Sequence, residues 1–207
     1  EAVLLHLARL AATGQEEHAR SLRPLIQDNT PLEEQALSWM LSAVKHLASV
    51  GNAEHAQVMA QTAVDLLPGE EAAWLALIEL HLNRKEYEAA LQACRKALDA
   101  PIPADGVAGF MDDAFVYLNA PDKRLETWEQ ITAARPKDSV ILLHLGLAFE
   151  ATDKWRQAAD TYATLLELGH ASQNLRLRLG TALVRAGDSE ERSEEHTSEL
   201  QSLRTIS

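Results

Sequence analysis

The sequence has little cysteine, glycine, proline or aromatic content, and it has no long apolar run. Cys94 is the only cysteine, so the chain cannot form an intramolecular disulfide, and the redox compartment is left open. No apolar run is long enough to cross a membrane, and the stretch AVLLHLARLAA near the N-terminus lacks a cleavage-like end, so we do not expect a signal peptide there. Ala and Leu dominate instead, which favours helices with closely packed faces.

Basic residues are also scarce relative to acidic ones. The 207 residues include 19 Lys and Arg against 31 Asp and Glu, which gives a formal net charge of -12. A phosphate backbone is bound by clustered Lys and Arg, so this balance argues against a nucleic-acid partner.

The usual motifs of enzymes and metal sites are absent from the sequence. There is no HExxH, CxxC, GxSxG or glycine-rich phosphate loop, and the histidines are not at ligand spacing. We therefore predict no catalytic, cofactor-binding or metal-binding residues, and we expect that the chain is not an enzyme. Cys94 is expected to be a small buried hydrophobic residue, and His81 a histidine in the core.

A period of 34 residues organises most of the chain. Blocks that begin at residues 37, 71, 105, 139 and 173 place the same residue class at the same position. Apolar residues recur at three-to-four spacing in both halves of a block, which predicts two helices. Gly, Asn and Asp tolerate left-handed backbone angles, so we predict a tight turn at the fifteenth position. That position is occupied by Gly51, Lys85, Asn119, Asp153 and Gly187.

This pattern resembles the tetratricopeptide repeat. The block from residue 71 matches the family's signature at Trp74, Leu77, Tyr87, Ala90, Ala97 and Leu98. The block from residue 139 matches it at Leu145, Gly146, Phe149, Trp155, Ala158 and Tyr162. The resemblance implies an all-α fold, a right-handed α-solenoid of helix-turn-helix repeats in which the aromatic side chains pack in the core and the first helices line a concave groove.

The expected organisation has three parts. Residues 1–36 form a divergent N-terminal helix pair with a turn at residues 13–15, and Thr30-Pro31-Leu32-Glu33 reads as a capping box that starts the next helix. Residues 37–191 form the repeat array. Its divisions are 37–70, 71–104, 105–138, 139–172 and the partial repeat 173–191.

The block 105–138 departs from the pattern. Asp112 and Arg124 stand where the family usually places small residues. We expect the two side chains to form a partly buried ion pair, and the solenoid to bend in this block.

Residues 192–207 form the third part and break the repeat pattern. The stretch RSEEHTSELQS, residues 192–202, resembles the in-frame translation of a common sequencing adapter, and Ile206-Ser207 fits its continuation. We interpret 192–207 as a non-native tail. The chain is then expected to be a fragment, of bacterial origin, whose truncated last repeat frays and allows weak self-association.

Side chains of the first helices provide the candidate binding residues. The candidate set is Leu41, Lys45, Leu75, Glu79, Phe110, Asp113, Tyr117, Leu143, His144 and Glu150. Phe110, Tyr117 and Leu143 are expected to be apolar anchors for a peptide. The alternative is that the set only covers neighbouring helices. The Lys, Asn and Arg clamp that some family members use for a terminal carboxylate is missing.

The acids of the set, Glu79, Asp113 and Glu150, favour a partner that carries Lys or Arg. We therefore predict a protein-interaction scaffold that binds an apolar or amphipathic, partly basic segment. Two alternatives stay open: the repeat arm of a larger transferase or kinase, and a membrane-tethered envelope assembly factor. We expect a protein or peptide partner and no direct membrane insertion of this segment. A cytoplasmic location is favoured over a periplasmic or membrane-tethered one.

Overall fold

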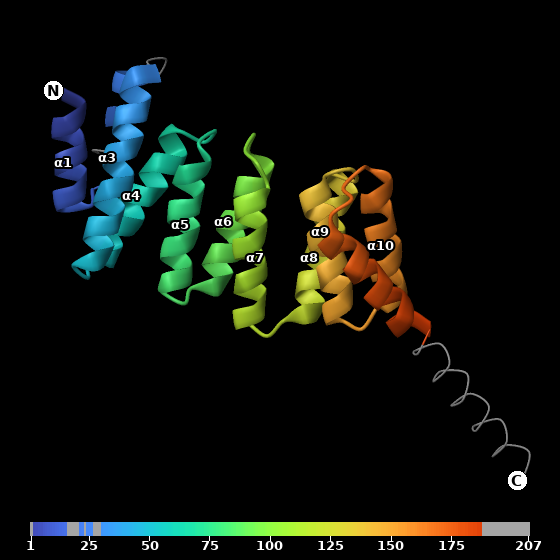
Figure 1. Cartoon of the computed structure of the whole chain (residues 1–207). Coiled ribbons are helices and arrows are strands. Elements are labelled where there is room, and N and C mark those ends of the chain that lie inside the picture. Colours follow the sequence, from blue (N-terminus) through green and yellow to red (C-terminus); the bar gives the residue numbers. More distant parts are fainter. Residues whose placement is uncertain (1, 16–20, 23, 27–29, 188–207) are drawn as a thin grey trace, which may run out of the picture. The chain divides into compact units, whose positions relative to one another are not determined.

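The computed structural model describes residues 2–15, 21–22, 24–26 and 30–187 (Figure 1). Within these ranges the chain consists of α-helices and short turns, and no β-strand occurs. The predicted all-α class is confirmed. The chain divides into two compact units, Glu1–Leu118 and Asn119–Ser207, and this division falls inside the block 105–138. The tail interpreted as non-native lies outside the described residues.

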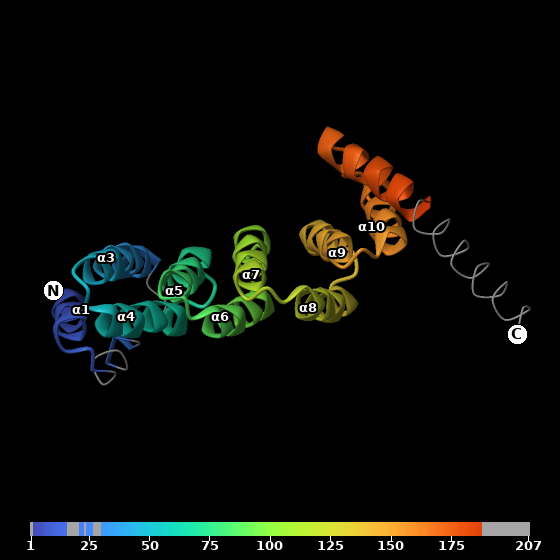
Figure 2. The same ribbon diagram turned by 90° about the horizontal axis from the view of Figure 1, so that it is seen from below.

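The first unit is a stack of helix pairs. Its helices are α1 (Ala2–Thr13), α3 (Thr30–Ser49), α4 (Ala53–Leu66), α5 (Glu71–Asn83), α6 (Tyr87–Asp99) and α7 (Asp105–Tyr117). α5 packs against α3 and α7. α4 packs against α3 and α5, and α6 packs against α5 and α7. Figure 2 shows the resulting two rows, with α3, α5 and α7 in one and α4 and α6 in the other. We call the row of α3, α5 and α7 the first-helix layer.

The second unit repeats the same helix pairing. It contains α8 (Pro121–Ala134), α9 (Ser139–Ala151), α10 (Trp155–Glu167) and a further helix over residues 173–187. α9 packs against both α8 and α10. α5, α7, α9 and the last helix begin at residues 71, 105, 139 and 173, so the predicted period of 34 residues is confirmed across both units.

The predicted tight turns are present at the fifteenth position of four blocks. The backbone φ angle is positive there, at 81° for Gly51, 60° for Lys85, 49° for Asn119 and 55° for Asp153. Gly14, in the turn predicted at residues 13–15, also has a positive φ of 63°. Lys85 shows that the turn geometry is imposed by the helix pair, because a lysine gains nothing locally from a left-handed conformation.

Core positions are occupied largely as the repeat pattern predicts. Trp74, Trp128 and Tyr162 are buried, whereas Tyr87 and Trp155, also predicted to pack in the core, are only half-buried. Each of the two half-buried residues is the first residue of a second helix.

The predictions for three single residues have different outcomes. Cys94 and His81 are both buried, as predicted. Asp112 is buried as well, but it lies in the first unit and Arg124 lies in the second, so their ion pair stays a prediction.

None of the helices in the described ranges combines the length and the apolar character needed to cross a bilayer.

Candidate peptide-binding surface

Seven of the ten candidate residues lie on the first-helix layer. Leu41, Leu75 and Phe110 are half-buried, one on each of α3, α5 and α7. Exposed polar and aromatic side chains accompany them on the same helices, namely Lys45, Glu79, Asp113 and Tyr117. The other three candidates, Leu143, His144 and Glu150, belong to α9 in the second unit. The candidates therefore form two sets, one for each unit.

Leu75 packs against the neighbouring first helix. A Cβ built on Gly106 of α7 would lie 3.2 Å from Cδ2 of Leu75 and 2.9 Å from Oε1 of Glu71. A glycine at this position thus lets α5 and α7 approach closely. Leu75 is at least partly a packing residue, which is the alternative that the sequence left open for the whole set.

Tyr117 presents an aromatic surface to solvent at the end of α7. Its ring stacks on that of Tyr87 from α6, with centroids 5.1 Å apart and planes 9° from parallel. Tyr117 and the adjacent Val116 each keep 66% of their surface exposed. Stacking holds the ring of Tyr117 in place while leaving most of it free for contact with a partner.

Leu143 lines a pocket of about 400 Å³ in the second unit. Leu165 and Leu175 are buried in its floor, and Val140 and Leu143 are half-buried in its wall. The other lining residues are mostly polar: His170, Ala171 and Ser172 are exposed, and Ser139 is half-buried. A pocket with an apolar floor and a polar rim suits an apolar side chain whose backbone stays near solvent.

His144 and Glu150 are engaged within the protein. The ring of His144 stacks on Trp128 of α8, with centroids 5.1 Å apart. The hydroxyl of Tyr162 donates to Oε1 of Glu150, and Nη1 of Arg178 donates to Oε2, each at 2.8 Å. Burial is the main cause that raises the pKa of Tyr162 far above its usual range, and the Glu150 carboxylate raises this pKa further. Glu150 thus joins three helices, a role that the sequence analysis missed.

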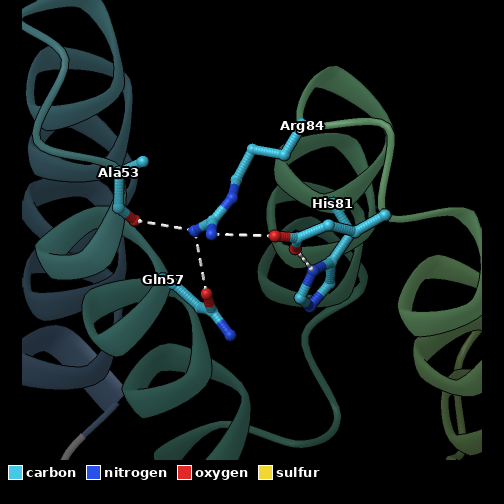
Figure 3. A network of polar contacts seen from close by, with 5 residues as sticks. Ala53, Gln57, His81 and Arg84 are labelled. Atoms are coloured by element: carbon cyan, nitrogen blue, oxygen red, sulfur yellow. Dashed lines mark hydrogen bonds and ion pairs between the residues drawn. The ribbon is translucent and has the colours of Figure 1, made fainter.

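A polar network, also missed from the sequence, connects two successive helix pairs of the first unit (Figure 3). Arg84, just after α5, donates from Nη1 to Oε1 of Gln57 on α4 at 2.9 Å. Its Nη2 lies 2.8 Å from Oε1 of Glu86, whose Oε2 is 2.8 Å from Nδ1 of His81. The hydrogen bond with His81 lowers the pKa of Glu86 most, with further lowering from Arg84 and an opposing effect of desolvation.

Metal ligands are not clustered in the described part of the chain: no group of three or more His, Cys, Asp or Glu side chains there could hold a metal ion. Burial raises the pKa of the Cys94 thiol to about 12. A thiol held in its neutral form is a poor nucleophile.

The helix pairs, their 34-residue spacing and the left-handed turn inside each pair together decide the fold type. The described chain is an all-α protein built of helix-turn-helix repeats. No protein-family model matches the sequence. Tetratricopeptide repeat protein 21 homolog of Caenorhabditis briggsae is 22% identical over 111 residues, which are 54% of this chain and 8% of that protein. The chain thus spans 8% of the length of this curated relative.

Solved tetratricopeptide-repeat structures resemble this one at low sequence identity. YrrB, described as having an unusual peptide-binding site, is 16% identical with a TM-score of 0.46, covering 79% of this chain and 82% of its own. TTC0263, a thermophilic protein of Thermus thermophilus, is 20% identical with a TM-score of 0.47, covering 88% and 97%.

Proposed function

We propose that this chain is a tetratricopeptide-type protein-interaction scaffold whose first-helix layer binds an apolar or amphipathic, partly basic segment. The exposed aromatic surface of Tyr117 carries the proposal. A tyrosine that is already oriented by stacking loses little conformational entropy on binding, and aromatic residues are enriched at protein interfaces. Val116 beside it extends the apolar contact.

The charge of the same layer supports a basic partner. Glu79 on α5 and Asp113 on α7 are exposed, and the chain as a whole carries a formal charge of -12. Exposed carboxylates near an apolar anchor attract Lys or Arg side chains and raise the association rate. Lys45 on α3 is the exception in this layer.

Glu150 is left out of this proposed contact set. Its carboxylate is already paired with Arg178, so it offers little net charge to a basic partner. Leu143 remains a proposed anchor in the second unit, because the pocket that it lines is open to an apolar side chain.

The test compares capture of partners from a lysate by the wild-type chain and by the double variant Phe110→Ala with Tyr117→Ala. We expect the double variant to lose the captured proteins while its circular dichroism stays helical. Val50→Ala is the matched control, because Val50 is an exposed apolar residue outside the first-helix layer. This variant should still capture the same proteins as the wild-type chain. Equal recovery by the wild-type chain and the double variant would refute the assignment.

The charge prediction is tested separately. Glu79→Lys with Asp113→Lys should slow association with the captured partner, whereas Glu88→Lys on α6, in the other helix row, should have a smaller effect. Association rates are measured at low and at high salt for both sets of variants. If the slower association comes from lost electrostatic steering, the difference from wild type should shrink at high salt, because salt screens the steering.

A further inference from the structure

The pocket lined by Leu143 opens beside the connection between α10 and the last helix. Leu143 belongs to α9, Leu165 to α10 and Leu175 to the helix over residues 173–187. The contact between Glu150 and Arg178 ties this last helix to α9. The pocket therefore lies among helices that are already packed together, and all of them belong to the second unit.

The end of α10 has the hydrogen bonds of a Schellman cap. Gly169, with a φ of 91°, donates its N–H to the carbonyl of Leu166, and the N–H of His170 donates to the carbonyl of Leu165, each at 3.0 Å. In this motif an apolar side chain just after the left-handed glycine commonly contacts the residue whose carbonyl it binds. Here that position is His170, which is exposed, and Leu165 lies in the floor of the pocket. The cap lacks its usual apolar contact.

In the first unit, the equivalent repeat position carries an apolar side chain of the chain itself. Ile102 is two repeats before His170 and only 7% of its surface is exposed. It belongs to the segment 100–104, APIPA, which leaves α6 in an extended conformation at Ala100. A Cβ on Gly106 would lie 3.2 Å from Leu75, so α5 and α7 approach closely at this junction. An aliphatic side chain is thus enclosed in the first unit where the second unit has an exposed histidine.

The charge of the pocket limits what can fill it. No Lys, Arg, Asp or Glu is among the residues that line it. A charged side chain would lose its hydration there without gaining an ionic partner, whereas an aliphatic side chain gains from leaving water.

We propose that this pocket binds an isoleucine or leucine side chain from an extended, uncharged stretch of a protein partner. The partner supplies the aliphatic contact that Ile102 makes possible in the first unit and that His170 does not provide in the second. The inference rests on the proposed scaffold function and names the anchor residue that the second unit selects.

The test uses a synthetic peptide with the sequence of residues 100–104, acetylated and amidated at its ends. It is titrated into the full chain with labelled Ile, Leu and Val methyl groups. We expect saturable NMR shifts at Val140, Leu143, Leu165 and Leu175, with a dissociation constant on the order of 1 mM. Peptides with alanine or lysine in place of the isoleucine keep both prolines and should bind at least about tenfold more weakly.

His170→Leu in the full chain should abolish binding of the peptide, because a leucine after Gly169 completes the cap from within the chain. The urea midpoint of this variant should equal or exceed that of the wild type. Gln157→Leu is the matched control: Gln157 is an exposed polar residue of α10 that does not line the pocket, so this variant should bind the peptide normally.

Three results with the peptides would overturn the proposal. They are the absence of saturable shifts in the wild-type chain, equal binding of the isoleucine and alanine peptides, and normal binding by His170→Leu. Failure of the scaffold function itself has a different signature, namely unchanged partner capture by the double variant Phe110→Ala with Tyr117→Ala. If the peptide does not bind but this variant loses its partners, only the pocket assignment is refuted.

Two further results would assign the pocket to another occupant and so refute a separate partner. Methyl shifts of the same residues that appear when the chain alone is concentrated would identify a second copy. Peptide binding that appears only after Leu200→Ser with Leu203→Ser would identify the end of the chain itself.

Discussion

Glu150 and Arg178 are 28 residues apart in the sequence, and their side chains meet at 2.8 Å in the second unit. The pair ties the last helix to α9, while the second carboxylate oxygen of Glu150 accepts the hydroxyl of Tyr162 from α10. One carboxylate thus holds three helices together. Because the side chain of Arg178 is about one-third exposed, the buried hydroxyl of Tyr162 is the more sensitive part of this arrangement.

Glu150→Ala should destabilise the second unit by about 1–3 kcal/mol, because the buried hydroxyl of Tyr162 loses its acceptor. Hydrogen exchange of the α9 and α10 amides measures the change in opening free energy. In a Tyr162→Phe background the same substitution should cost less, since no hydroxyl is left unpaired. An equal cost in both backgrounds would show that the hydroxyl is not the reason.

Glu86 should make the first unit less stable in acid. Its pKa is lowered from the ordinary value of 4.5, so its contribution is fully present above that pH and is lost as the pH falls through the lowered pKa. Urea midpoints measured between about pH 6 and about pH 3 should therefore fall more steeply for the wild type than for Glu86→Gln. The effect is modest, because Glu86 is partly exposed. Glu88→Gln, an exposed residue two positions later, should leave the wild-type slope unchanged.

Gly146→Ala and Gly180→Ala should change stability in opposite directions. The added Cβ at residue 146 overlaps the Tyr162 ring and should cost about 1–3 kcal/mol. The same change at residue 180 meets open space and should stabilise the helix by about 0.5–1 kcal/mol, because alanine is the better helix former. Urea unfolding followed by circular dichroism measures both values. Stabilisation by both substitutions would contradict the close approach at Gly146.

Cys94 should be inert in the native protein. It is buried, and its pKa is raised to about 12, so little thiolate is present near neutral pH. Reaction with an aromatic disulfide reagent should be slow and should accelerate when α6 opens in denaturant. Because the chain has a single cysteine, the labelling rate reports this opening directly. Rapid labelling under native conditions would place the thiol at the surface instead.

Hydrophobic periodicity was enough to predict most of the fold. The helix starts at 71, 105, 139 and 173 follow from a 34-residue repeat of apolar positions, and the turns follow from the residues between them. The candidate surface was less predictable. Tyr117 is exposed and its binding role stays a prediction, whereas His144 and Glu150 contact Trp128 and Arg178. A repeat register gives the face of a helix but not the partner of a polar side chain.

The sequence by itself determined the helix pairs, their period, the left-handed turns and the burial of Cys94 and His81, because each follows from local spacing along one chain. The tertiary structure decided the rest. The Arg84 and Glu86 network and the contacts of Glu150 join helices whose side chains meet only after the pairs stack. The open place at Gly180 is likewise a tertiary property. Gly146 and Gly180 are the same residue at the same position, and only the ring of Tyr162 distinguishes them.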